Sequence, residues 1–567
     1  MLMPRKKRLL SSNCSRTNKK KLLRCAFLCI AATLIVSLAI PLQALAADQA
    51  AKSASIDSGS ANDQITLRAG LYNLEFPPVF NALRRPSYNQ LNELYGATHV
   101  GLAFFDSDFS PRPCLAEKWE VSSDGSSIKF YLVKNATWND GKPVTAQDVK
   151  FTYEYWRDNH LYRQGGWLDA YLDSVEVLDD YTGVIHLKEP YAYYFIKSLF
   201  PSVYIVPKHV WEKVEKPREY GEPDGMIGCG PFIFEKIDRD ADTAYFKANP
   251  DYFKGKPAID RIEWKHFRTV DSALLALKKG DIDVLIDESP EGVLAPSLLG
   301  EKGLTIEIGP NPGLPLLIFN YKKYPLNVTD FRKAVSYAID YQSLVDAIEA
   351  GYGEVPGAGI LPSSIVESNP DLPKLEYNLT KANDLLDSLN FKDTNGDGIR
   401  NLPNGTELRF QVIAWNDQKD MRVAEMLSHM LKKAGIEFQP YTNELSVLQK
   451  MVWDDRSYDM HIDFHDPYMT ALGFATIDLV PLQYGTCTDP EFSELYNVTM
   501  SARTPEEMKA AVYQLQDYYA KELPGIALYW SKSIYPYRSD RFEGWIPLEG
   551  YGLTSHKSWF SIKPVGA

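Results

Sequence analysis

The sequence predicts an α/β protein with more than one domain. Runs in which apolar residues alternate with polar ones are interrupted along the chain by stretches with a single apolar helical face, a succession typical of mixed α/β folds. About 520 residues follow the N-terminal segment, too many for one hydrophobic core, so two or three domains are expected. No internal repeat and no low-complexity segment interrupts the part expected to fold.

Residues 1–46 are predicted to be a secretory signal peptide. Nine Lys and Arg residues precede an apolar run over residues 25–40, which Pro41 breaks, and small residues lead to a cleavage site at Ala46. The alternative is an uncleaved anchor, but the run is shorter than the roughly 20 residues of a spanning helix. We expect cleavage near Ala46, export to the periplasm or an equivalent extracytoplasmic space, and a disordered leader over residues 47–64.

The charge and the cysteines narrow the class of protein. Without residues 1–46, 52 of the 61 Lys and Arg residues remain against 74 Asp and Glu, a net charge of −22. A chain this acidic is a poor partner for nucleic acid or an anionic membrane. Cys114, Cys229 and Cys487 are too widely spaced for a metal knuckle, and an odd number permits at most one disulfide. We expect a soluble monomer that binds no nucleic acid and carries no cofactor.

The first third of the chain predicts strands and hairpins. "ITLRAGLY" (65–72) indicates a strand, and alternating runs turn at Asp124-Gly125 and again at Asp179-Asp180, two hairpin signals. Between them, "WNDGKPVTAQDVKF" (138–151) combines a tight turn with a capping box of Thr145 and Asp148. The stretch therefore predicts a junction from strand to helix and contains no reactive group.

Three further helices are predicted in the middle of the chain. The first ends at Gly280, before a strand that reaches Ile286. A second covers residues 330–351, with Asp330 as its cap and Gly351 as its stop. A third lies within residues 421–434 and stops at Gly435, before another strand.

Several of these stretches resemble one known family. "LAEKWEVSSDG" (115–125), "WNDGKPVTAQDVKFTYEY" (138–155), "GCGPFIFEK" (228–236), "NPDYFKGKPAIDRIEW" (249–264) and "LPGIALYW" (523–530) are similar, in this order, to motifs of the family 5 extracellular solute-binding proteins. These are the peptide and nickel receptors of ABC importers. The resemblance extends from about residue 66 to residue 550.

The resemblance implies a two-lobed periplasmic-binding-protein fold of type II, from the large cluster with an extra subdomain. Lobe I would comprise residues 65–95, 226–312 and 532–567, with the extra subdomain over 96–225, and lobe II would comprise residues 313–531. The lobes would close on a ligand about hinges near residues 226, 313 and 531 and present it to a membrane permease. The ligand would be a small peptide or a similar amine-bearing solute, with a nickel chelate or an oligosaccharide as the alternatives.

The segment "YDMHIDFHDP" (458–467) carries the predicted ligand site. Peptide-binding members have a D-x-x-D/E-P motif whose first Asp pairs with the α-amino group of the ligand, and the resemblance gives that role to Asp463. In a second alignment His465 replaces the tryptophan of the family and Asp466 lies closer to the amine. An ammonium group that leaves water needs such a carboxylate partner.

The same segment allows a metal site. A strand would place His461, Asp463 and His465 on one face, where they could bind a metal or a metal chelate, although a solvated or hydrogen-bonded face is the simpler interpretation. The strand ends at Asn320 and Trp415 and the loop near Asn73 are expected to line the ligand cleft. For Trp415, ordinary core packing is an equal alternative.

The sequence carries no enzymatic signature and only an incomplete calcium-binding one. The chain has none of the linear motifs of the nucleophile elbow, the zinc proteases or the nucleotide-binding loops, so we expect a binding protein, with a secreted hydrolase as the alternative. "DTNGDGIRN" (393–401) resembles a calcium loop from Asp393 to Asp397, but Asn404 stands where a bidentate Glu belongs. A surface turn is therefore favoured.

Overall fold

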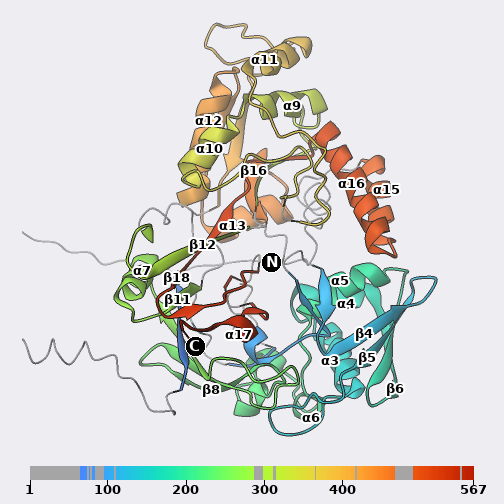
Figure 1. Ribbon diagram of the computed structural model, residues 1–567. Helices are drawn as coiled ribbons and strands as arrows, with labels where there is room; N and C mark the ends of the chain where they lie inside the picture. The colour runs from blue at the N-terminus through green and yellow to red at the C-terminus, as the bar shows by residue number, and fades with distance from the viewer. Residues whose placement is uncertain are drawn as a thin grey trace, which may run out of the picture. The chain divides into compact units, whose positions relative to one another are not determined.

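The computed structural model describes residues 64–72, 76, 80–83, 95–106, 110–286, 298–310, 314–363, 365–415, 418–465, 489–548, 552–553 and 555–566. In these ranges the strands form sheets of seven, five and four strands and two small two-stranded sheets (Figure 1). The two-stranded sheets pair β2 (Ala103–Phe105) with β3 (Pro111–Pro113) and β19 (Phe542–Glu543) with β20 (Lys563–Pro564). None of the described helices is both long and apolar enough to cross a membrane.

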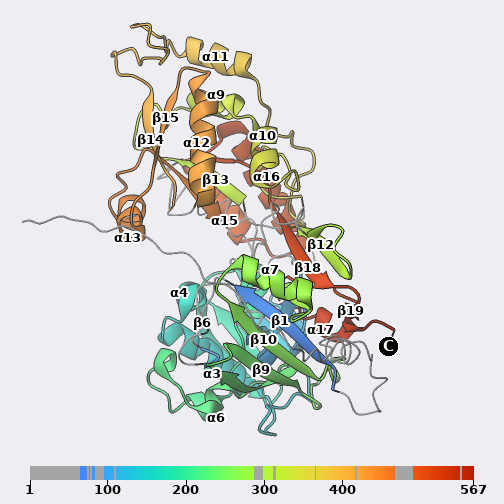
Figure 2. The same ribbon diagram turned by 90° about the vertical axis from the view of Figure 1, so that its left-hand side faces the viewer.

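The seven-stranded sheet is assembled from three distant parts of the chain. Its order is β12-β18-β11-β1-β10-β9-β8, with β1 parallel to both β10 and β11. The strands are β1 (Thr66–Tyr72), β8 (Phe232–Asp238), β9 (Thr243–Ala248), β10 (Arg261–Phe267), β11 (Val284–Ile286), β12 (Leu304–Pro310) and β18 (Lys532–Arg538). Helix α7 (Val270–Lys279) packs Ala273 and Leu277 on this sheet (Figure 2). It ends, as predicted, at Gly280, which has a positive φ of 79°.

The four-stranded sheet is antiparallel and lies entirely within residues 116–187. Its order is β4-β5-β7-β6, from β4 (Ala116–Val121), β5 (Ser127–Leu132), β6 (Leu172–Asp179) and β7 (Thr182–Leu187). Both predicted hairpins are confirmed by these pairings. The sheet shares one core with α3 (Ala146–Asp158), α4 (Tyr162–Tyr171), α5 (Ala192–Ser202) and α6 (Lys208–Trp211). The capping box at the start of α3 is formed by Thr145 and Asp148, as predicted.

The five-stranded sheet is covered on both faces. Its order is β15-β14-β16-β13-β17, from β13 (Leu314–Phe319), β14 (Arg409–Ile413), β15 (Glu437–Tyr441), β16 (Met460–His465) and β17 (Gly525–Ala527). One face packs on α9 (Thr329–Ala338), α10 (Tyr341–Ile348), α11 (Leu379–Ser388) and α12 (Gln418–Lys432). The other face packs on α15 (Pro490–Met500) and α16 (Pro505–Glu522), and on α13 (Leu445–Gln449) with the π-helical turn Lys450–Asp454.

The predicted single helix over residues 330–351 is wrong, because the structure has α9 and α10 there. Ile339 leaves the helical conformation with φ −87° and ψ 123°. The Asp340 carboxylate then accepts the backbone N–H of Ser343 at 3.1 Å and caps a new helix. Asp330 lies in the first turn of α9 and does not cap it, since Val328 holds that position.

The chain passes between the seven-stranded and five-stranded sheets at two connections. The first joins β12, which ends at Pro310, to β13, and the second joins β17 to β18, which begins at Lys532. The hinges expected near residues 313 and 531 fall on these connections. The hinge expected near Met226 does not fall on either connection. Met226 ends a short 3-10 turn between α6 and β8, and β8 is a strand of the seven-stranded sheet. The lobe boundaries remain a prediction.

Candidate functional site

The candidate site is centred on β16, the middle strand of the five-stranded sheet. Met460 and Ile462 are fully buried against the core that contains α9 and α12. Side chains of a strand alternate between the faces, so His461 and Asp463 share the other face. That is the face covered by α16 and by the π-helical turn Lys450–Asp454.

Asp463 lies near the C-terminal end of β16. The strand ends there form the edge of the five-stranded sheet from which the chain crosses to the seven-stranded sheet. Asp463 stands opposite Leu316 of β13, and His465 stands opposite Leu314, the first residue of β13 after the crossing. Strand β14 runs parallel to β16 and ends at the same edge, with Ile413 opposite His461. Side chains at the ends of β14 and β16 therefore lie next to the connection between the two sheets.

Asp463 sits between two apolar clusters. On β13, Leu314, Leu316 and Ile318 pack with α16, and on β14 Ile413 packs with Tyr458 and Leu448. Asp463 itself is only partly exposed. Burial raises the pKa of Tyr458 to about 12, and the negative charge of Asp463 contributes in the same direction. A carboxylate in these surroundings is suited to pair with a cation.

Trp415 follows the end of β14 and belongs to an aromatic cluster beside Asp463. Its ring centroid lies 5.5 Å from that of Trp453 and 6.5 Å from that of His461, and Tyr458 packs edge-on against His461 at 4.9 Å. The indole N–H of Trp415 is buried and has no hydrogen-bond partner among the described residues. The Trp415 ring therefore packs as in a core, and its indole N–H could donate to a further acceptor.

Asn320 lies away from this edge. Because β13 runs antiparallel to β16, Asn320 follows the end of β13 that pairs with Met460, the opposite end from Asp463. Its side chain is fully buried and donates to the carbonyls of Tyr458 at 2.8 Å and Arg456 at 3.1 Å. Asn320 therefore holds the turn before β16, and the expectation that it lines the cleft is corrected.

The remaining predicted residues are described only in part. Asn73 and Asp466 lie outside the described residues, and His465 is described as the last residue of β16 without its side chain. His461 is fully buried. Among the described side chains, no group of three or more His, Cys, Asp and Glu residues is arranged to hold a metal ion.

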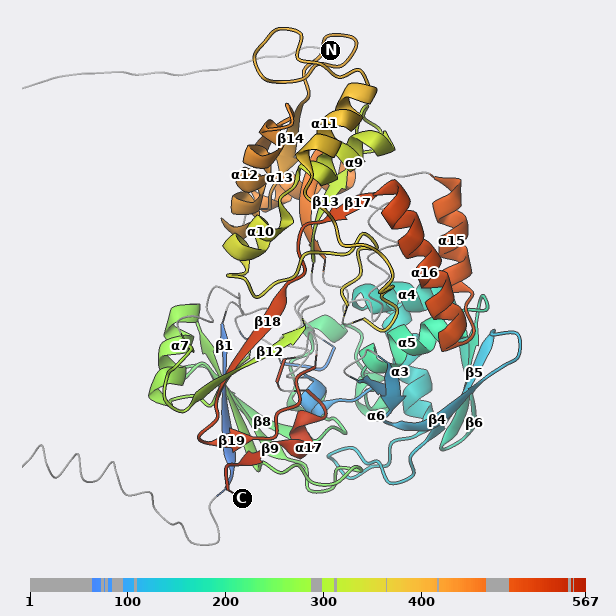
Figure 3. The ribbon, with the colours of Figure 1, turned by 45° about the horizontal axis from the view of Figure 1, so that its top comes forward.

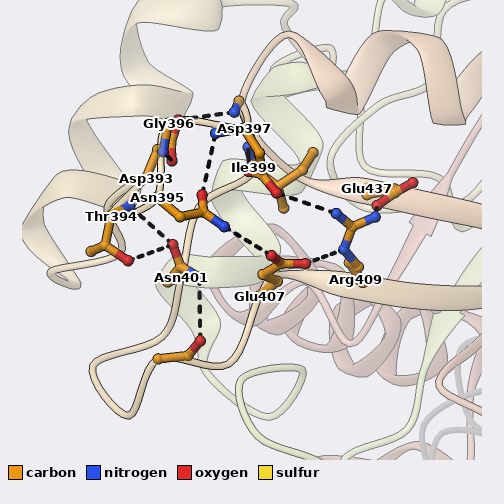
Figure 4. A network of polar contacts seen from close by, with 12 residues as sticks. Asp393, Thr394, Asn395, Gly396, Asp397, Ile399, Asn401, Glu407, Arg409 and Glu437 are labelled. Atoms are coloured by element: carbon orange, nitrogen blue, oxygen red, sulfur yellow. Dashed lines mark hydrogen bonds and ion pairs between the residues drawn. The ribbon is translucent and has the colours of Figure 1, made fainter.

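The calcium-like turn is a network of polar contacts with its own partners (Figure 4). The Asp393 carboxylate accepts the backbone N–H groups of Gly396 at 2.7 Å and Gly398 at 2.9 Å. Arg409 forms ion pairs with Asp397 at 3.4 Å and with Glu407. The carboxylates are thus engaged by backbone amides and a guanidinium, as the surface-turn interpretation requires.

Sequence reasoning missed a buried polar cluster beside the β17–β18 connection. The Glu349 carboxylate, 1% exposed, pairs with the Lys419 ammonium at 2.9 Å and accepts from the Ser531 hydroxyl at 3.2 Å. Lys419 lies in the first turn of α12, shortly after Trp415. The three residues come from separate segments of the chain, so no short sequence pattern predicts the cluster.

Comparisons with known proteins agree with this architecture. Residues 110–470 match the family model described as "Bacterial extracellular solute-binding proteins, family 5 Middle". The oligopeptide-binding protein AppA of Bacillus subtilis is 28% identical over 394 residues, which cover 67% of this chain and 70% of AppA.

Two solved structures share the fold. The structure of Bacillus subtilis AppA in complex with a nonapeptide has a TM-score of 0.69 at 22% identity and covers 89% of this chain and 100% of AppA. NikZ of Campylobacter jejuni in complex with Ni(L-His) has a TM-score of 0.69 at 21% identity and covers 88% of this chain and 100% of NikZ. The expected two-lobed periplasmic-binding-protein fold is thereby confirmed. The protein is a binding protein and not an enzyme, and it belongs to the bacterial extracellular solute-binding proteins of family 5.

Proposed function

We propose that this protein is the extracytoplasmic receptor of an ABC importer and captures small peptides, or similar amine-bearing solutes, between its two lobes. It is exported with a signal peptide cleaved near Ala46 and delivers its ligand to a membrane permease. The observation that carries the proposal is the position of Asp463, a partly buried carboxylate at the sheet edge where the chain crosses between the sheets.

Asp463 supplies what the terminal ammonium of a peptide needs. An ammonium that is taken out of water must be paired with a negative group, because an unpaired buried charge is strongly unfavourable. The apolar clusters on either side of Asp463 exclude water and so strengthen this pairing. We also propose Trp415 for the wall of this site. The ligand-binding roles expected for His465 and Asp466, two and three residues after Asp463 in the chain, and for Asn73 stay part of the proposal.

A peptide ligand is also supported by a relative of this chain and by the chemistry of strand ends. AppA, a relative of this chain, is named as an oligopeptide-binding protein, and its solved structure holds a nonapeptide. An extended peptide can also pair its backbone with N–H and C=O groups at strand ends, which gives affinity without dependence on side chains.

A metal chelate is the second candidate. Its support is that NikZ, which has the same fold, was solved with Ni(L-His), and that His461 shares a strand face with Asp463. The full burial of His461 counts against it as a direct ligand.

Calorimetry with a free tripeptide and its N-acetylated form tests the proposal. Acetylation leaves a desolvated carboxylate without its counter-charge, which typically costs about 2–5 kcal/mol, or roughly 30- to 5,000-fold in affinity. Asp463→Asn should weaken binding of the free tripeptide by a similar factor and change binding of the acetylated one little, because both changes remove the same interaction. Asp384→Asn, on the exposed side of α11, is the matched control and should leave affinity unchanged.

Two results would reject the peptide assignment. If acetylation, Asp463→Asn and Asp466→Asn each leave affinity within about twofold, these carboxylates do not pair with the amine. If His465→Ala abolishes binding of a nickel–histidine complex while no peptide binds, the receptor is a metal-chelate receptor.

A further inference from the structure

Lys197 and Glu367 form a buried ion pair outside the candidate site. The ammonium of Lys197 contacts the carboxylate of Glu367, and the two residues are 1% and 3% exposed. Lys197 is on α5, and Glu367 lies in a turn between the bridge residues Gly357 and Lys374. Charged side chains are rarely this buried unless they are paired, so the pair depends on the packing around it.

The two partners belong to different packed bodies. Helix α5 packs Phe195 and Leu199 into the core of the four-stranded sheet. The turn of Glu367 is held on α16 by Gln516, whose side chain donates to the Glu367 carbonyl at 2.7 Å and accepts from the Asn369 N–H at 2.9 Å. Helix α16 in turn covers the five-stranded sheet, and Figure 3 shows α16 above α4 and α5, two helices of the four-stranded sheet.

Apolar side chains surround this contact. Tyr194, one turn before Lys197 on α5, packs into the core that also holds Leu314 and Val512, and so does Phe105. The second carboxylate oxygen of Glu367 is buried and has no hydrogen-bond partner among the described residues. The negative charge of Glu367 is therefore held out of water and is matched chiefly by Lys197.

Removing one partner of such a pair changes the balance between the joined and separated bodies far more than the intact pair does. When they separate, both charged groups regain water, so the intact pair contributes modestly to the balance between the two arrangements. If one partner is removed, the other charge stays desolvated only when the bodies are in contact, and that arrangement alone is penalised.

We propose that Lys197 and Glu367 are a closure latch: the pair forms when the lobes close, and it sets ligand affinity without touching the ligand. Neither residue lies on β16 or at the ends of β13 and β14, where the ligand is proposed to bind. The apparent affinity for a ligand is the intrinsic affinity of the closed arrangement multiplied by the fraction of the protein that adopts this arrangement without ligand. The proposal rests on closure around a ligand, which is part of the proposed function.

Small-angle scattering during a titration with a mixture of free tri- to pentapeptides tests the latch. Protein first freed of bound solute by refolding should show a smaller radius of gyration as peptide is added. Lys197→Glu places two carboxylates together and should raise the half-closing peptide concentration about 100-fold or more. The swapped pair Lys197→Glu/Glu367→Lys should restore it to within about tenfold, which also shows that the site still folds.

Two controls make the result decisive. Glu367→Gln, a smaller change, should shift the half-closing concentration in the same direction as Lys197→Glu. Glu376→Lys breaks the exposed pair of Lys381 and Glu376 on the five-stranded side of the molecule, and it should have no effect because exposed pairs contribute little.

The outcomes distinguish a failure of the latch proposal from a failure of the proposed peptide ligand. Equal half-closing concentrations for the wild type and Lys197→Glu, within about twofold, overturn the latch while peptide capture stands. If peptides cause no compaction, peptide capture fails, and the same comparison is made with nickel–histidine or with short oligosaccharides. If none of these solutes compacts the wild type, closure fails and the latch fails with it.

Discussion

Replacing His556 with phenylalanine should remove a pH-dependent loss of stability from this protein. The imidazole stacks on Phe104 with ring centroids 4.8 Å apart and lies beside Phe560 at 5.7 Å, and its Nε2 is 3.5 Å from the Tyr252 hydroxyl. Burial, helped by the positive charge of Lys254, lowers the pKa of His556 from its usual 6.5 to about 3. Phenylalanine keeps the stacked ring and cannot take up a proton.

The sign and size of the effect follow from that pKa. The folded protein keeps His556 neutral, so the associated stability is fully present above pH 6.5 and is lost as the pH falls from there towards 3. At about 1.36 kcal/mol per pH unit, the loss at pH 5 would reach about 2 kcal/mol for a fully buried ring. Because His556 keeps part of its surface exposed to solvent, we expect a loss of about 1–2 kcal/mol in the free energy of unfolding at pH 5.

Urea unfolding followed by tryptophan fluorescence at pH 7 and pH 5 measures this difference. Between these pH values the wild type should lose about 1–2 kcal/mol more than His556→Phe. His429→Phe, at an exposed position of α12, is the control and should keep the wild-type pH dependence. If His556→Phe and the wild type change in parallel, within about 0.3 kcal/mol, the reasoning about His556 is refuted.

Three other substitutions test the packing. Asp148→Ala removes the N3 half of the capping box of α3, which accepts the Thr145 N–H at 2.9 Å, and also the acceptor of the Lys208 N–H at 2.9 Å. Urea unfolding should therefore show a loss of about 2–4 kcal/mol, against little for the exposed Asp158→Ala. Gly228→Ala would bring a methyl group to 2.0 Å from the Thr98 carbonyl oxygen. The melting temperature of this variant should therefore fall by several degrees. Gly166→Ala places its methyl group in open space and should leave the melting temperature unchanged. Arg332→Met leaves the carbonyls of Leu326, Glu522 and Leu523 without their donor, and calorimetric unfolding should show a loss of about 3 kcal/mol or more.

Local features of the fold could be predicted from the sequence because their causes are local. The hairpin turn at Asp124-Gly125, the capping box of Thr145 and Asp148 and the stop of α7 at Gly280 each depend on residues within a few positions of one another. The break between α9 and α10 was missed because residues 330–351 read as one helix, with Asp340 in its interior. Its competing role as a cap decides the structure.

Whether the predicted site residues lie together depends on the direction of their strands. Asp463 and Trp415 end parallel strands and so reach one edge together, whereas Asn320 ends an antiparallel strand and reaches the opposite edge. Strand direction within a sheet is a property of the whole topology, which short motifs do not contain. The Lys197–Glu367 pair joins residues 170 positions apart, and the Glu349–Lys419 pair likewise has no sequence signature.

The most direct test of peptide capture is a retention experiment with competing solutes. Ligand-free protein is mixed with equimolar free tripeptides, their N-acetylated forms, nickel–histidine and short oligosaccharides, then separated from unbound solute, denatured and examined by mass spectrometry. Retention of free tripeptides over their acetylated forms by at least about 30-fold is the predicted result, because only the free amine can pair with Asp463. Equal retention of both forms, or retention of nickel–histidine or an oligosaccharide in their place, would contradict the account.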